Sequence, residues 1–138
     1  MTTATLEAPA TTIIPRDATA LVARLLLAVI FLLAGIGKLA AIEGTTAYIA
    51  SMGLPFATAV CYATIALEVA GAAMLIAGYR TRAAALALGV FSIAAGVIFH
   101  ANFANQAEMT SFLKNLAIAG GMFQLAAFGP GRFSIDRS

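Results

Sequence analysis

Four long apolar stretches, separated by short polar segments, run along this chain. They cover about residues 18–42, 56–78, 82–101 and 109–128. A helix rises about 1.5 Å per residue, so each stretch is long enough to cross the ~30 Å hydrocarbon core of a bilayer. The pattern predicts an all-α fold, an integral membrane bundle of four antiparallel helices.

The segments between and beyond these spans complete the predicted organisation. Residues 1–17 are expected to form a flexible cytoplasmic tail, 18–129 a single four-span transmembrane domain, and 130–138 a short second cytoplasmic tail. The loop at 43–56 is apolar enough for a partly helical segment at the membrane interface. Gly78 is expected to end the second helix, and Asn105 and Glu108 have capping-box spacing before the fourth. A cleavable signal peptide would have a shorter apolar core, so the first span is expected to remain in the membrane.

Composition supports a membrane protein and excludes several other classes. Of 138 residues, 62% are apolar and 10% are charged, whereas about 25% are charged in a typical soluble domain. The mean hydropathy is +0.96. The net charge of +2 gives no support to nucleic-acid binding. Cys61 is the only cysteine, which excludes an intramolecular disulfide and a cysteine-rich metal site, and no metal site is predicted.

Charges outside the spans predict an orientation. The two loops on one side of the four-span arrangement contain Glu43 and Glu108 and no lysine or arginine. The other side carries all the loop and tail arginines, which are Arg16, Arg80, Arg82, Arg132 and Arg137. By the positive-inside rule, both termini are expected to lie in the cytoplasm.

Every predicted span also contains at least one polar residue at membrane depth. The candidates for a functional or cofactor-binding site are Arg24, Lys38, Glu68, His100, Lys114 and Asn115. In the predicted topology all but two share the outer half of the membrane, because Glu68 lies near the midplane and Arg24 near the cytoplasmic face. The sequence therefore favours Lys38 over Arg24 as a site residue, and Arg24 is interpreted first as an anchor.

Glu68 is the hardest of these residues to explain by structure alone. A lone carboxylate at mid-bilayer costs roughly 2.5–3.5 kcal/mol unless a cation pairs with it, and Lys38, Lys114 or Arg24 is the expected partner. Two interpretations stay open: a buried salt bridge that fixes helix register, or a carboxylate that handles protons or orients a ligand. The catalytic candidates are Glu68, Lys38 and His100, although a single histidine near an interface is more often structural.

Small residues recur four positions apart, a spacing that lets helices approach closely in lipid. The pairs are Ala66/Ala70, Ala73/Ala77, Ala85/Gly89 and Ala117/Gly121. They indicate close helix contacts, although an alanine-rich chain also produces such pairs by chance.

Together, these features resemble the DoxX family. The resemblance covers about residues 20–136 and rests on the order and spacing of Arg24, Phe31, Gly35 and Lys38, of Glu68 to Gly71, of Gly78 to Arg82, of Phe112, Lys114, Asn115, Gly120 and Gly121, and of the ending from Gly129 to Asp136.

This resemblance implies a small multi-pass protein of the bacterial inner (cytoplasmic) membrane. It also implies a link to membrane oxidoreduction, because the family takes its name from a subunit associated with quinone-coupled thiosulfate oxidation. The site candidates match recurrent polar positions of the family, none of which has a general catalytic role.

The residues meet the needs of a quinone site in part. A quinone requires an apolar slot and polar groups for its two carbonyls, which Lys38, Glu68, His100 and Lys114 could supply. No dinucleotide loop, cysteine set or histidine pair indicates an electron carrier, so electrons would come from a redox protein partner. The sequence thus favours a membrane subunit that anchors such a partner and contributes a quinone pocket. Whether the chain is itself an enzyme stays open.

The competing interpretation is a small membrane carrier or a non-catalytic scaffold whose buried charges specify helix packing. A homo-oligomer is compatible with both interpretations.

Overall fold

A computed structural model describes residues 14–137, which form five helices and no strand. They are α1 (Arg16–Ala40), α2 (Ile42–Ser51), α3 (Ala57–Ala77), α4 (Thr81–Phe99) and α5 (Gln106–Phe128). Residues 1–13 of the predicted flexible tail lie outside the described residues.

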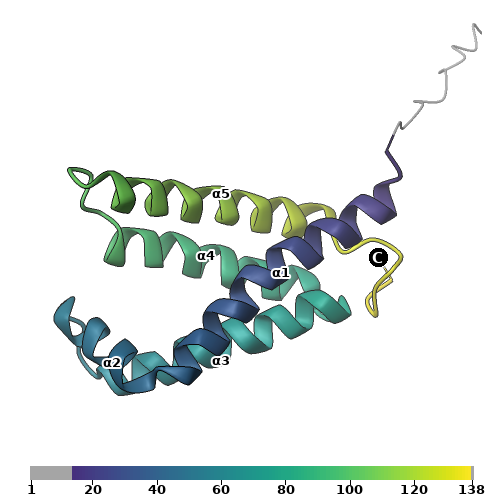
Figure 1. The fold of residues 1–138 in the computed structure, drawn as a ribbon. Coiled ribbons are helices and arrows are strands. Elements are labelled where there is room, and N and C mark those ends of the chain that lie inside the picture. The colour runs from purple at the N-terminus through teal and green to yellow at the C-terminus, as the bar shows by residue number, and fades with distance from the viewer. Residues whose placement is uncertain (1–13, 138) are drawn as a thin grey trace, which may run out of the picture.

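The four long helices pack as two pairs. Helix α1 crosses α3, α4 runs alongside α5, and contacts between α3 and α4 join the pairs (Figure 1). Helix α1 touches α5 far less than it touches α3. The short helix α2 lies against α3, at the same end of the molecule as the connection between α4 and α5 (Figure 1). The seam between α1 and α5 is therefore loosely closed.

Of the five helices in residues 14–137, three are long and apolar enough to cross a membrane: α1, α3 and α4. Helix α5 has 23 residues, but Lys114, Asn115 and Gln124 lower its hydropathy. The all-α class is confirmed. The fourth span, the four-helix transmembrane bundle and the cytoplasmic placement of both termini stay predictions.

The chain breaks one residue before the first predicted span was expected to end. Ala41 leaves helical geometry, with its N–H bonded to the Lys38 carbonyl at 3.1 Å, and Ile42 begins α2. Neither glycine nor proline marks this position. The break lets α2 turn back on α3, where it buries Ile49 against Cys61 and Ile65. Burial of this second apolar cluster is the physical reason for the break.

The core between the helix pairs is built on small residues. A Cβ on Gly71 would lie 2.9 Å from Leu88 Cδ1, and one on Gly89 would lie 2.7 Å from Phe123 Cε1. Both helices approach this closely because glycine has no side chain. Ala85 and Gly89 form a buried pair, as predicted, whereas the alanines of the Ala66/Ala70 and Ala73/Ala77 pairs are exposed. Those alanines are therefore not buried by contacts within the described part of this chain.

Candidate functional site

A partly buried ion pair joins α1 to α3. Lys38 Nζ lies 3.0 Å from Glu68 Oε1 and 2.9 Å from Oε2, and the Glu68 side chain is only 4% exposed. Of the three cations considered as partners for Glu68, the structure selects Lys38. Because both carboxylate oxygens accept from one ammonium, the large cost of an unpaired charge in the bilayer is offset.

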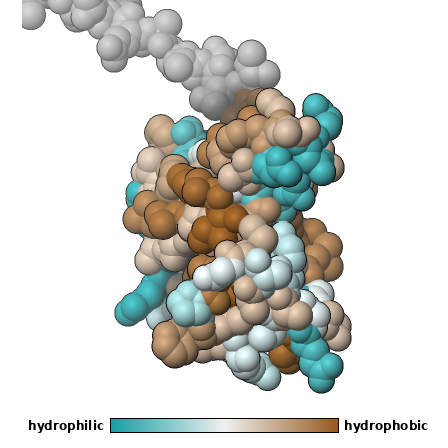
Figure 2. Space-filling model, turned by 90° about the vertical axis from the view of Figure 1, so that its left-hand side faces the viewer, coloured by the Kyte–Doolittle hydropathy of each residue, from teal (hydrophilic) through white to brown (hydrophobic). Residues whose placement is uncertain are grey.

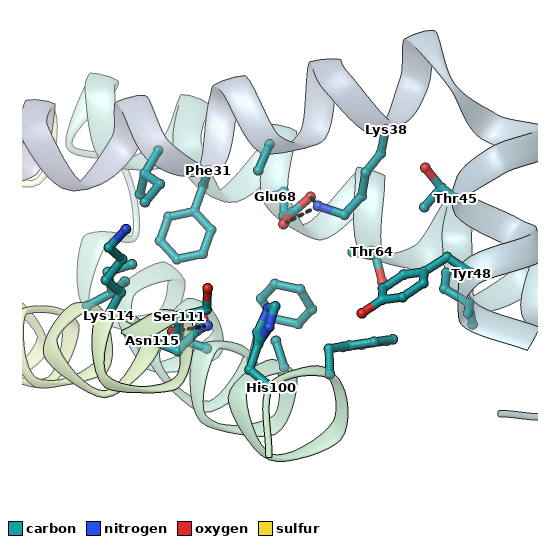
Figure 3. Close-up of a pocket in the computed structure, with 18 residues that line it drawn as sticks. Phe31, Lys38, Thr45, Tyr48, Thr64, Glu68, His100, Ser111, Lys114 and Asn115 are labelled. Atoms are coloured by element: carbon teal, nitrogen blue, oxygen red, sulfur yellow. Dashed lines mark hydrogen bonds and ion pairs between the residues drawn. The ribbon is translucent and has the colours of Figure 1, made fainter. Parts of the chain in front are cut away.

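The ion pair forms one wall of a cavity of about 360 Å³. Lys114, Asn115 and His100 line the same cavity from α5 and the end of α4, opposite Lys38 and Glu68 (Figure 3). Five of the six candidates from the sequence are thus brought together. The volume lies at the lower end of the range for small-molecule sites.

Hydrogen bonds hold the opposite wall. Asn115 donates from Nδ2 to the Ser111 carbonyl at 3.0 Å, and His100 Nδ1 lies 2.7 Å from Glu108 Oε2. Asn105 caps α5 by accepting from the Ala107 and Glu108 N–H groups, as its spacing predicted. Glu108 does not complete the capping box, because its carboxylate turns to His100 instead.

Several lining residues were not among the predicted candidates. Tyr48 lines the cavity and stacks on Phe99 with ring centroids 5.6 Å apart. The others with polar side chains are Thr45, Thr64, Ser92 and Ser111. Thr64 and Ser111 precede Glu68 and Asn115 by four residues, so helical spacing alone would have placed each pair on one face.

Apolar side chains complete the walls. Phe31, Phe91, Phe99 and Ile118 are among them. Figure 2 views the end of the molecule with α2 and the α4–α5 connection, where hydrophobic surface lies between separate hydrophilic patches. An apolar slot with a few convergent polar groups is typical of small-molecule sites.

Arg24, the sixth candidate, lies at the other end of the molecule and does not line this cavity. Its side chain is fully buried, and Nη2 donates to the Phe133 carbonyl at 2.6 Å. Nη1 contacts the position that a Cβ on Gly78 would occupy, so this residue must be glycine for space as well as for its φ of +67°. Arg24 therefore holds the C-terminal segment against the end of α3.

The C-terminal segment is also bonded to the helix ends. The N–H groups of Ile135 and Asp136 donate to the carbonyls of Ala77 and Gly78. The Asp136 carboxylate accepts from the backbone N–H groups of Arg80 and Thr81, at 2.9 and 2.8 Å, and so caps α4. Burial opposes ionisation of Asp136, but these hydrogen bonds and the Arg24 charge outweigh it and hold its pKa below the usual range. The ending is thus part of the packed structure.

The cavity can bind, orient and exchange protons with a small ligand. Its polar atoms include ammonium, amide and hydroxyl donors and a carboxylate. Within residues 14–137, no three His, Cys, Asp or Glu side chains gather as metal ligands would.

Comparison with known proteins identifies the family. The DoxX family model matches residues 19–101. The chain is 40% identical over 121 residues to "Inner membrane protein YqjF" of Escherichia coli (strain K12), covering 88% of this chain and 92% of that protein. It is 33% identical over 122 residues to "Inner membrane protein YphA" of the same organism, covering 85% and 87%. No solved structure matches the chain.

These similarities agree with the apolar helices. Both relatives are inner membrane proteins by name, and three helices here are able to cross a bilayer, so this chain is a multi-pass protein of the inner membrane. Because the family match covers more than half of its length and both relatives align over most of it, the chain belongs to the DoxX family.

Proposed function

We propose that this DoxX-family protein is the membrane subunit of an oxidoreductase system and that its cavity binds a quinone. The observation that carries the proposal is the cavity itself: an apolar, aromatic slot with polar groups on two opposite walls. A quinone ring is flat and apolar, and its two carbonyl oxygens lie at opposite edges. One carbonyl accepts from Lys38, and the other accepts from Asn115 or Lys114.

Proton exchange with the ligand is assigned to Glu68 and to the His100–Glu108 pair. Reduction of a quinone to the quinol takes two electrons and two protons. Glu68 lies beside the carbonyl bound by Lys38, and His100, which is paired with Glu108, lines the same cavity. These groups exchange protons with the ligand. The electrons come from a protein partner that carries a redox centre and docks on this subunit.

The scaffold alternative also has an observation in its favour, because Lys38–Glu68 directly joins α1 and α3. The exchanged double variant, Lys38→Glu with Glu68→Lys, separates the two functions. If the pair only fixes packing, the exchange restores wild-type properties in full. If the pair binds quinone, the exchange restores thermal stability but not affinity, because the ammonium then comes from α3 instead of α1 and no longer meets the ligand carbonyl in the same geometry.

The direct experiment measures binding of a short-chain quinone to detergent-purified protein, together with identification of any co-purified quinone. Lys38→Met and Glu68→Gln are expected to weaken binding at least about tenfold, since the first removes a charge-assisted donor to the ligand worth ~1.5–3 kcal/mol and the second removes the carboxylate that holds this donor in place. Glu43→Gln makes the same chemical change at an exposed position outside the cavity and should bind like wild type. Wild-type affinity in both cavity variants would refute the site. Substrate flux in proteoliposomes without a redox partner would favour a carrier.

A further inference from the structure

A second hollow lies at the opposite end of the molecule, along the loosely closed seam between α1 and α5. Its volume is about 1030 Å³, and no residue lines both this groove and the polar cavity. Its walls are mainly apolar, and they include Ala23, Leu26, Leu27, Gly121, Leu125 and Phe128. Leu26 and Phe128 are 70% and 59% exposed, so the groove is open to the surrounding lipid.

One end of this groove is basic. Arg16 and Arg132 line it, and both side chains are exposed. In the described part of the chain the Arg132 guanidinium donates no hydrogen bond, and Arg16 donates only a long one, of 3.4 Å, to the Phe128 carbonyl. The Asp17 carboxylate lies nearby and accepts from the Arg132 backbone N–H at 3.0 Å. The rim thus carries one surplus positive charge.

The start of α1 adds to the positive charge at the rim of the groove. Pro15 precedes the helix, and within residues 14–137 no side chain caps it. The N–H groups of its first turn therefore lack helical partners and contribute a partial positive charge at the rim. The groove combines a basic end with an apolar trough that follows the helices.

We propose that this groove binds one molecule of an anionic diacyl phospholipid. Its phosphate lies between Arg16 and Arg132, and an acyl chain follows the apolar trough towards Leu27 and Gly121. Charge complementarity favours an anionic headgroup over a zwitterionic one. Basic pockets between membrane helices are recognised lipid-headgroup sites, and here the apolar trough begins at the rim itself.

The experiment offers the full-length protein, in mild detergent, an equimolar mixture of phosphatidylglycerol and phosphatidylethanolamine with identical acyl chains. Native mass spectrometry then counts the bound lipids. Wild type is expected to retain one phosphatidylglycerol in preference to phosphatidylethanolamine. The double variant Arg16→Gln/Arg132→Gln should lower that preference by roughly 30-fold, which corresponds to about 2 kcal/mol at about 1 kcal/mol per arginine.

Matched controls separate the groove from general charge. Arg80→Gln/Arg137→Gln removes two exposed arginines from outside the groove and should leave the preference unchanged. Ala23→Phe fills the trough and should reduce retention of both lipids, whereas Val22→Phe, on the exposed side of the same helix, should not. Unchanged helix content by circular dichroism shows that each variant is folded.

Three results would overturn the proposal. Wild type retains both lipids equally, Arg16→Gln/Arg132→Gln keeps the wild-type preference, or the control pair lowers the preference as much as the groove pair. Because the groove shares no residue with the cavity, loss of lipid selectivity with intact quinone binding, or the reverse, tells the two proposals apart.

Discussion

The two ends of helix α1 use a basic side chain in different ways. Near its end, Lys38 meets the carboxylate of Glu68 at the wall of an accessible cavity, and its side chain stays 29% exposed. Near its start, Arg24 is fully buried and donates to a main-chain carbonyl. The first arrangement leaves polar groups within reach of a ligand. In the second, the polar group makes a hydrogen bond within the fold and is not accessible to a ligand. Depth in the membrane alone therefore does not distinguish a charge that a ligand can reach from one that is buried within the fold.

The largest expected effect is on the signal of reporter fusions, which shows on which side of the membrane each end of helix α1 lies. Reporter fusions at residue 81 and at the C-terminus are expected to give cytoplasmic signals, and a fusion near residue 105 a periplasmic one, because all the loop and tail arginines lie at the Arg24 end. The signals should be all-or-none. A cytoplasmic signal near residue 105 would contradict the four-span topology and place both ends on one side.

Arg24→Met tests whether the buried arginine holds the fold. The variant leaves the Phe133 carbonyl unpaired and is expected to lower the free energy of unfolding by roughly 1–3 kcal/mol, measured by denaturation in mixed micelles. Arg24 Nε and Nη1 have no partner in the described residues, and their burial costs part of what the bond to Phe133 contributes. Arg16→Met, at an exposed position, should change stability by less than about 0.5 kcal/mol. Equal or greater stability of Arg24→Met would mean that the unpartnered nitrogens cost as much as the bond gives.

Asp136 provides a smaller effect that depends on pH. Because its pKa is lower in the folded protein, its stabilisation is fully present above the unfolded value, about 3.9, and is lost as pH falls through the folded value. Asp136→Asn should cost roughly 0.3–1 kcal/mol at pH 7, as expected for loss of a negative charge at a helix N-terminus. Thermal unfolding followed from pH 7 to 3 should show the two proteins converging at the acidic end. A constant difference over that range would exclude a role for the carboxylate charge.

His100→Gln is expected to have the smallest effect on stability. The His100–Glu108 pair is about one-third exposed, so its loss should cost less than about 1 kcal/mol. In the proposed function, however, this variant should weaken quinone binding while melting near the wild-type temperature. A large fall in melting temperature would show that this end of the molecule, too, uses its charges for the fold.

The sequence predicted much of the cavity, because a carboxylate in lipid requires a cation, and antiparallel helices place residues at known depths. Lys38 and Glu68 followed from that reasoning. The contribution of Tyr48 did not, since it depends on the break at Ala41, which no glycine or proline marks. The partner of Arg24 could not be predicted from the sequence either. It is a main-chain carbonyl, which every residue has, so no side-chain pattern points to it.

Helix positions were predictable for a similar reason. Long apolar runs indicate helices that are buried in lipid or in protein. Gly78 ended α3 as expected, because glycine readily adopts a positive φ. The alanine pairs on α3 were misleading, since an exposed alanine and a packed alanine are identical in a list of residues. Only the burial of Ala85 and the packing of Gly89 against α5 distinguished contact from composition.

The bond from Arg24 to Phe133 also has a consequence for synthesis of the chain. These residues are 109 positions apart, whereas Lys38 and Glu68 are 30 apart. At about 5–20 residues per second, Glu68 follows Lys38 after roughly 2–6 s, but Phe133 follows Arg24 only after roughly 5–20 s. Phe133 must therefore be synthesised before Arg24 in the first helix can make this bond. Until then the nascent protein must keep that charge at the membrane surface or hydrated within the insertion machinery.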